Sequence, residues 1–207
     1  ARGPGDVLNV MLADAAGHGL SAALSAMPLT QAFYSMTAKG FPLSSIAEEL
    51  NRKLKALLPA DRFVAAILAS VDVRNQTVEV WNGGNPDAAF VTVDGKVSMQ
   101  WASNHPPLGI LPAELFSGAT ETVVFHEPGQ LVLCSDGLVE AENPDGQWLG
   151  LAGMVTAWRG ERRPSWDGLT HPVTGVVILV GGAFLVHWRP GRGTLEPPYG
   201  DLQIGAG

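Results

Sequence analysis

The sequence predicts an α+β fold in which antiparallel strands form the sheets. Two long helical patterns follow one another near the start, and strand patterns joined by short turns then run in series from residue 63. A wound parallel sheet would alternate helices with strands instead. Hydrophobic residues make up 46% of the 207 residues and charged residues 16%, a composition typical of a globular protein.

The helical region follows one buried strand. Residues 7–13 form an apolar run typical of a strand, and residues 20–39 are expected to form a helix that ends at Gly40, a residue suited to a helix C-cap. A second helix is expected to start near Ser45, because Ser45 and Glu48 have capping-box spacing. Its apolar positions recur on one face, at Ile46, Leu50, Leu54 and Leu57.

The rest of the chain reads mainly as strands. They are expected over residues 63–72, 77–81, 88–93, 96–101, 122–125 and 131–135. Asp94-Gly95 is a strong hairpin signal between two of them. Residues 173–186 are apolar but shorter than the roughly 20 residues of a membrane-spanning helix, so they predict a core strand or hairpin. Residues 189–207, rich in Gly and Pro, predict an irregular tail.

Composition argues against several classes of function. The formal charge is −7 and the basic residues never cluster beyond pairs such as Arg162-Arg163, so no nucleic-acid partner is expected. No segment predicts a membrane partner. Cys134 is the single cysteine, which rules out an intrachain disulfide and favours a reducing, cytoplasmic location. It ends an apolar run, which predicts a buried, inert thiol. The chain begins without Met, and we interpret it as a fragment of a longer protein.

Two aspartates carry the candidate chemistry, because each follows an apolar run and precedes glycine. Asp14 opens the stretch Asp14-Ala15-Ala16-Gly17-His18-Gly19, and Asp136 lies in Ser135-Asp136-Gly137. Asp before Gly is common in turns, so either one alone reads equally well as a turn residue. Together, at two strand ends, they predict a site for hard divalent cations such as Mg²⁺ or Mn²⁺. Two such ions activate a water molecule and neutralise phosphoryl oxygens.

The neighbouring loops have simpler interpretations. His18 is a candidate cation ligand, acid or loop hydrogen-bonding residue, and the last role is favoured because hard-ion sites rarely use imidazole. The loop around Asn85 and the segment His105–Gly109 both read as ordinary turns or connectors. The Lys and Ser/Thr of a phosphate-binding loop are missing after Gly17, and no Gly-x-Ser-x-Gly elbow supports a serine hydrolase.

In this order, the stretches resemble the SpoIIE/RsbU branch of the PPM (type 2C-like) metal-dependent serine/threonine phosphatases. Residues 14–19 are similar to its Asp-x-x-Gly-His-Gly block, and residues 135–140 to its Ser-Asp-Gly-hydrophobic-x-Glu block. Residues 83–86 resemble its Asn-Ala-Gly-His-Asn-Pro loop, with Gly84 at the His position, and residues 107–109 match its Pro-Leu-Gly segment. The resemblance covers residues 5–150.

The resemblance implies a four-layer αββα sandwich of two antiparallel sheets flanked by helices. It also implies hydrolysis of phosphoserine or phosphothreonine by water held between two Mn²⁺ or Mg²⁺ ions. Asp14 and Asp136 would be the catalytic residues and, with the carbonyl of Ala15, the metal ligands. His18, Gly19, Asn85 and Gly137 would support them. The implied substrates are small phosphorylated regulatory proteins of bacterial partner-switching or two-component signalling, such as anti-anti-sigma-like proteins. A sensor or receiver domain often precedes such a domain.

Departures from the family pattern define an alternative. We predict a phosphatase domain over residues 1–150, truncated at its N-terminus, and a divergent end of the same domain plus a tail over residues 151–207. The family's earlier Gly-Asp strand is missing, and His171-Pro172-Val173-Thr174 stands where an Asp-Asp-x-Thr block is expected. The alternative function is therefore a catalytically impaired pseudophosphatase that acts as a protein-binding adaptor.

Overall fold

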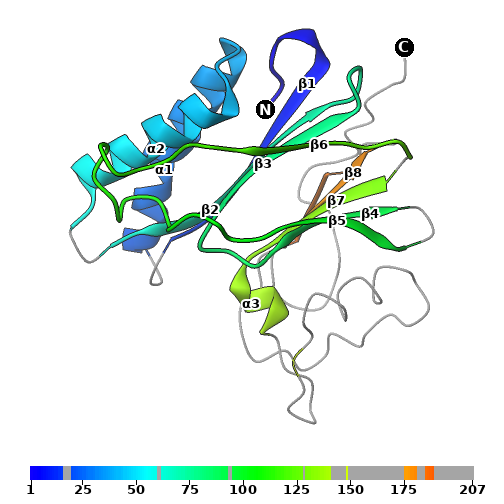
Figure 1. The fold of residues 1–207 in the computed structure, drawn as a ribbon. Coiled ribbons are helices and arrows are strands. Elements are labelled where there is room, and N and C mark those ends of the chain that lie inside the picture. The colour runs from blue at the N-terminus through cyan, green and yellow to red at the C-terminus, as the bar shows by residue number, and fades with distance from the viewer. Residues whose placement is uncertain are drawn as a thin grey trace. The chain divides into compact units, whose positions relative to one another are not determined.

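The computed structural model describes residues 1–15, 20–59, 62–92, 95–127, 129–140, 148, 175–180 and 185–188. These residues belong to two compact units (Figure 1). The first unit comprises residues 1–85 and 101–126, and the second comprises residues 86–100 and 127–207.

The first unit is built on a four-stranded antiparallel sheet with the order β1-β2-β3-β6. Its strands are β1 (Val7–Ala15), β2 (Val64–Asp72), β3 (Thr77–Gly83) and β6 (Glu121–Val124). A short 3-10 helix, η1 (Pro4–Asp6), precedes β1. Asp14 pairs with Ala65 and Ala15 pairs with Val64, so the end of β1 lies beside the start of β2. This register places the candidate carboxylate Asp14 at one end of the sheet.

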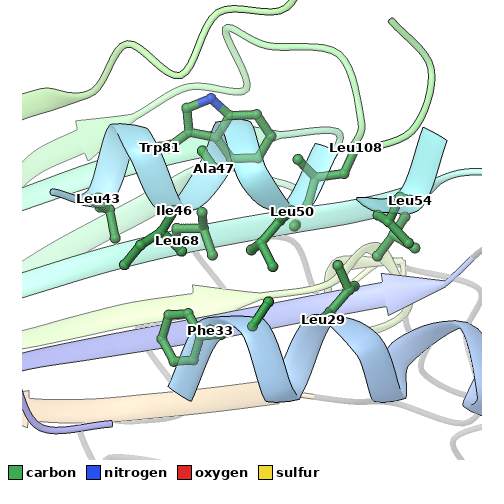
Figure 2. Packing of buried hydrophobic residues seen from close by; sticks show 13 residues of the cluster. Leu29, Phe33, Leu43, Ile46, Ala47, Leu50, Leu54, Leu68, Trp81 and Leu108 are labelled. Atoms are coloured by element: carbon green, nitrogen blue, oxygen red, sulfur yellow. The ribbon is translucent and has the colours of Figure 1, made fainter. Parts of the chain in front are cut away.

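Two helices, α1 (Leu20–Ala38) and α2 (Leu43–Leu57), lie side by side over one face of this sheet (Figure 1). Figure 2 shows the side chains that meet there, with Leu29 and Phe33 of α1 near Leu50 of α2 and Leu68 of the sheet. The core also contains Trp81 and Leu108, both fully buried. Met11, Ala13 and Ala15 pack against this core. Because side chains alternate along a strand, Asp14 belongs to the opposite face.

A long segment before β6 packs along α2, and we call residues 107–118 the strap. It contacts the last turns of α2 near Gly109 and the first turn near Gly118, so it runs antiparallel to the helix. Between these points the Phe116 ring packs on Trp81, and the Trp81 indole Nε1 donates to the Ser117 carbonyl at 3.1 Å. The strap therefore covers the edge of the core that α2 leaves open.

The second unit has a five-stranded antiparallel sheet with the order β5-β4-β7-β8-β9. Its strands are β4 (Ala88–Thr92), β5 (Val97–Trp101), β7 (Gly129–Cys134), β8 (Gly175–Val180) and β9 (Leu185–Trp188). A one-turn helix, α3 (Asp136–Val139), begins just after β7. β7 lies between β4 and β8, so the strand that leads to Asp136 is hydrogen-bonded on both sides.

The predicted α+β class with two antiparallel sheets and helices is confirmed, and so are all six predicted strands between residues 63 and 135. The predicted hairpin over residues 173–186 corresponds to β8 and β9. The predicted capping box is wrong, because α2 begins at Leu43 and its N-cap residue, Pro42, makes no side-chain capping bond. The sequence analysis also missed α3. Within the described residues, no helix is long and apolar enough to cross a membrane.

Candidate functional site

Asp14 lies exposed near the end of β1. Its partner on β2 is Ala65. A Cβ atom built on Gly84, just beyond β3, would lie 3.3 Å from the Cβ of Ala65. The row Asp14, Ala65, Gly84 therefore crosses three neighbouring strand ends. The exposed Asp14 side chain is accessible from solvent at this end of the sheet.

The loop after β3 requires glycine at two positions. A Cβ on Gly83 would lie 2.7 Å from the Pro106 carbonyl oxygen and would also meet the Trp81 ring. Gly84 has a φ of 84°, which favours glycine, and a Cβ there would lie 2.5 Å from the Pro107 ring. Its N–H donates to the Ser103 hydroxyl at 2.7 Å. The Pro107 ring thus occupies the space that a side chain at residue 84 would need.

Asn85 is the buried polar residue of this loop. Its side chain is 5% exposed, and its Nδ2 atom has no hydrogen-bond partner among the described residues. A buried amide donor without a partner is unfavourable by about 1–3 kcal/mol. Such a donor indicates a place where an oxygen atom, of water or of a ligand, completes the hydrogen bonding.

Asp136 belongs to the second unit, where it follows β7 and opens α3. It is exposed, and its Oδ1 accepts a 2.7 Å hydrogen bond from the Gly137 N–H. The Glu140 N–H donates to the Asp136 carbonyl at 2.9 Å and closes the turn. The local geometry thus holds the side chain outside the strand ladder while leaving its other oxygen available.

Cys134, two residues earlier, is confirmed as a buried thiol. Burial, together with the negative charge of Asp87, raises the pKa of Cys134 to about 12. A thiol with such a pKa is protonated at neutral pH and is a poor nucleophile. Cys134 therefore plays a packing role beside Asp136.

The structure brings together only part of the predicted site. Asp14, Ala15 and Asn85 belong to the same end of the first unit's sheet. Asp136 and Gly137 belong to the second unit, so their joint action with Asp14 stays a prediction. His18 and Gly19 lie outside the described residues, as do His171–Thr174. Among the residues that are described, no three His, Cys, Asp or Glu side chains gather into a metal-binding group.

The donors that are present fit a hard divalent cation by their chemistry. Asp14 and Asp136 are both exposed carboxylates at strand ends, and oxygen donors of this kind suit Mg²⁺ and Mn²⁺. Mg²⁺ in particular keeps several waters and needs few protein ligands.

The sequence analysis missed one residue near this site, Asn51 of α2. It is fully buried, and its side chain bonds the backbone of the strap at two points, Gly109 and Leu111. The signal in the sequence is a lone polar residue directly after Leu50 on the apolar face of a strongly amphipathic helix. Its partners are 58 and 60 residues away, and so the pattern alone did not indicate them.

Comparison with known proteins gives one family. Residues 4–177 match the family model described as Stage II sporulation protein E (SpoIIE). The chain is 27% identical over 135 residues to the phosphoserine phosphatase RsbP of Bacillus subtilis (strain 168), a match that covers 63% of this chain. It covers only 33% of RsbP, so the chain spans about a third of that relative.

Two solved structures show the same fold. The RsbU and RsbW domains of a Mycobacterium tuberculosis protein match with a TM-score of 0.61 and 22% identity, over 74% of this chain and 41% of that one. The PP2C phosphatase domain of SpoIIE from Bacillus subtilis, solved with a fragment of its regulatory domain, matches with a TM-score of 0.58 and 16% identity, over 78% of this chain and 51% of that one. At such identities the likeness establishes the fold alone.

Proposed function

Because the chain belongs to the SpoIIE family, we propose that it is a metal-dependent protein phosphatase acting on phosphoserine or phosphothreonine. The resemblance identified from the sequence motifs is thereby confirmed, and relatives of the chain are PP2C-type serine/threonine phosphatases. The observation that carries the proposal is Asp14, an exposed carboxylate at the end of β1 that opens the family's first block. Its setting suits a group that must hold an ion and admit a substrate.

The residues of the chain have distinct roles in this proposal. When bound, two Mn²⁺ or Mg²⁺ ions would supply an activated water molecule and would neutralise charge on the phosphoryl group. Asp14, the carbonyl of Ala15 and Asp136 hold these ions. The unpartnered Asn85 amide donates to an oxygen at the site. His18, Gly19 and Gly137 shape the loops that carry the two carboxylates, and Gly137 already donates to Asp136.

The proposed substrate is a phosphorylated regulatory protein. The relative RsbP is a phosphoserine phosphatase, and partner-switching systems include both RsbP and RsbU proteins. We therefore infer an anti-anti-sigma-like phosphoprotein as the substrate, in the cytoplasm of a bacterium. Because the chain spans a third of RsbP, an upstream sensor or receiver domain in the parent chain is part of the proposal.

The test is Mn²⁺-dependent release of phosphate from a phosphoserine protein. Asp14→Asn and Asp136→Asn should each lower the rate by at least about 100-fold, because each removes an anionic ligand of a charge-stabilising ion. Asp72→Asn is the matched control, since Asp72 is a carboxylate of β2 at the opposite end of the same sheet. Unchanged rates in both site variants would overturn the proposal.

A second function, the pseudophosphatase adaptor, has an observation in its favour. Within the described residues no three His, Cys, Asp or Glu side chains form a metal-binding group, and the sequence has Gly84 where the family's loop has His. As an adaptor, the chain would bind its regulatory partner with the same affinity in Mn²⁺ and in a chelator. Partner binding that requires Mn²⁺ and is lost in Asp14→Asn would exclude this function.

A further inference from the structure

We propose that Asn51 is a positioning residue, which acts from helix α2 through the Pro107-Leu108-Gly109 turn on the strand ends that carry Asp14 and Asn85. This inference concerns a residue outside the sequence blocks compared with the family above. The placement of the turn by Asn51 does not depend on the function of the chain. The effect of that placement on catalysis rests on the proposed phosphatase function.

The first step is the environment of Asn51. Its side chain is fully buried on the face of α2 that also buries Leu50 and Leu54. Asn is a poor helix former, and a buried amide is unfavourable unless all its groups are bonded. A leucine at this position would suit both the helix and the core. The amide therefore has a role that an apolar side chain cannot fill.

The second step is how the amide is used. Its Oδ1 accepts a hydrogen bond from the Gly109 N–H at 2.8 Å, and its Nδ2 donates to the Leu111 carbonyl at 3.1 Å. The side chain thus bonds one donor and one acceptor of the strap, as a neighbouring strand would. One turn further along α2, the Lys55 ammonium donates to the Ile110 carbonyl at 3.0 Å. Three consecutive strap residues are therefore bonded to α2.

Close packing at Gly109 makes this attachment specific. Gly109 has a φ of 88°, and a Cβ there would lie 3.3 Å from the Cβ of Leu54. A side chain at residue 109 would have to displace Leu54 slightly and would be strained at this positive φ. Asn51 then fixes both the distance and the register of the turn along α2.

The third step connects the turn to the sheet. Leu108 and Val64, at the start of β2, exchange two backbone hydrogen bonds of 2.9 and 3.0 Å. Val64 is also the β2 partner of Ala15 at the end of β1. On the other side, the Pro107 ring lies against Gly84, and the His105 N–H donates to the Asn82 carbonyl at 3.2 Å. The turn is therefore in direct contact with the start of β2 and the end of β3, beside Ala65 and Gly84 of the Asp14 row.

These contacts form one continuous path within the first unit. Asn51 bonds Gly109, the adjacent Leu108 bonds Val64, and Val64 pairs with the residue after Asp14. A parallel branch runs through Pro107 to Gly84 and the Asn85 loop. A shift of the turn relative to α2 would move both branches, because interiors are close-packed and transmit displacement.

The experiment compares Asn51→Leu with Asn9→Leu in the 207-residue chain. Asn9 is a matched control, since it is a buried asparagine of the same unit whose Nδ2 donates to the Thr37 hydroxyl. Asn51→Ala, which adds no bulk, is measured beside them. Backbone amide exchange is followed by NMR at Gly109, Leu108 and Val64, with Ala69 and Val80 of the central ladder as references.

We expect both Asn51 variants to raise exchange at Gly109, Leu108 and Val64 by about 10-fold or more relative to the references, because lost buried hydrogen bonds favour local opening. The amide signals of Gly84 and Asn85 should shift as well. Asn9→Leu should leave the ratio between turn and reference amides within about 2-fold of the wild-type ratio. Equal acceleration throughout the unit, or a change confined to Gly109, would overturn the positioning role.

Kinetics tests the catalytic part separately. The Asn51 variants should lower kcat for a phosphoserine protein by about 10-fold while KM stays within about 2-fold, as expected for misplaced catalytic groups. An unchanged kcat in a variant with accelerated Leu108 exchange would overturn the link to catalysis. A wild-type chain without phosphatase activity would instead contradict the proposed function, and amide exchange would still test the structural path.

Discussion

At the scale of single residues, what stands beside Asp14 matters as much as the carboxylate. Ala65 and Gly84 are the small members of the row of strand ends, and the Pro107 ring lies against Gly84. A larger residue at position 65 would place its side chain on the face of the sheet that Asp14 also uses. The small neighbours are therefore part of the candidate site.

Cys134 gives a prediction about pH. Burial raises the pKa of Cys134 to about 12, whereas the thiol of the unfolded chain ionises near 9. As pH rises above 9 the unfolded chain loses this proton first, so the free energy of unfolding should fall with pH between about 9 and 12. The limiting slope is about 1.4 kcal/mol per pH unit. Urea unfolding of the wild type and of Cys134→Ala over this range measures the difference between them.

The expected result is that Cys134→Ala has a shallower pH dependence than the wild type, whatever the other groups contribute. Below pH 8 the free energies of unfolding of the wild type and of Cys134→Ala should change with pH in parallel. At these pH values the Cys134 thiol is protonated in both the folded and the unfolded wild type. The native thiol should also resist iodoacetamide at pH 8 and react once urea unfolds the chain. Rapid alkylation of the native protein would show that Cys134 is accessible and would contradict the prediction.

At the scale of secondary structure, the strands were predictable because their apolar patterns are long and bounded by turn residues. The start of α2 was not. A capping box at Ser45 contributes about 1 kcal/mol, whereas burial of Leu43, which is 2% exposed, contributes about 1.5–3 kcal/mol. Burial therefore extends the helix back to Leu43, with Pro42 at its N-cap. Where a local capping signal and tertiary packing favour different helix starts, the larger burial energy decides the boundary.

Part of the candidate site was likewise predictable from the sequence, and part was not. Asp14, Asn85 and Asp136 were predictable because each follows a strand pattern and lies in a short block of distinctive sequence. The attachment of the strap to α2 was not predictable, because Asn51 and Gly109 are 58 residues apart and neither stands out by itself. Contacts of this kind depend on the fold, which places the strap along the helix.

The strap leads to a prediction at its other end. A Cβ on Gly118 would lie 2.9 Å from Glu48 Cγ and would also meet the Ser44 carbonyl oxygen at the start of α2. Gly118→Ala should therefore push the strap away from α2 and lower the free energy of unfolding by about 1–3 kcal/mol. Urea unfolding monitored by tryptophan fluorescence measures the loss, since Trp81 lies under the strap and bonds Ser117.

Gly5→Ala is the control for this variant. Gly5 also belongs to the first unit, but a Cβ there would meet no atom within 4 Å. Its positive φ of 74° makes the substitution mildly unfavourable through the backbone alone. A loss in Gly118→Ala no greater than in Gly5→Ala would show that the strap accommodates the extra methyl group.

At the scale of the whole molecule, the two candidate carboxylates belong to different compact units, and the chain spans only part of its relatives. The proposed activity requires both carboxylates to hold ions in one working site. Ligand binding to the folded chain alone raises its stability according to the ratio of ligand concentration to Kd. Thermal unfolding in the presence of Mn²⁺ therefore reports on the whole site without any assumption about the substrate.

At a Mn²⁺ concentration of about 100 times Kd, the chain should gain about 2.7 kcal/mol, which raises the Tm by roughly 5–10 °C for a protein of this size. If Asp14 and Asp136 serve one site, Asp14→Asn and Asp136→Asn should each abolish most of the shift, and the double variant should lose little more. Asp72→Asn should keep the full shift. Losses that add between the two variants would show independent weak sites, and a wild type without any shift would favour the adaptor. Only the first outcome, in which each single variant loses most of the shift and the double variant loses little more, supports a phosphatase whose metal site needs both Asp14 and Asp136.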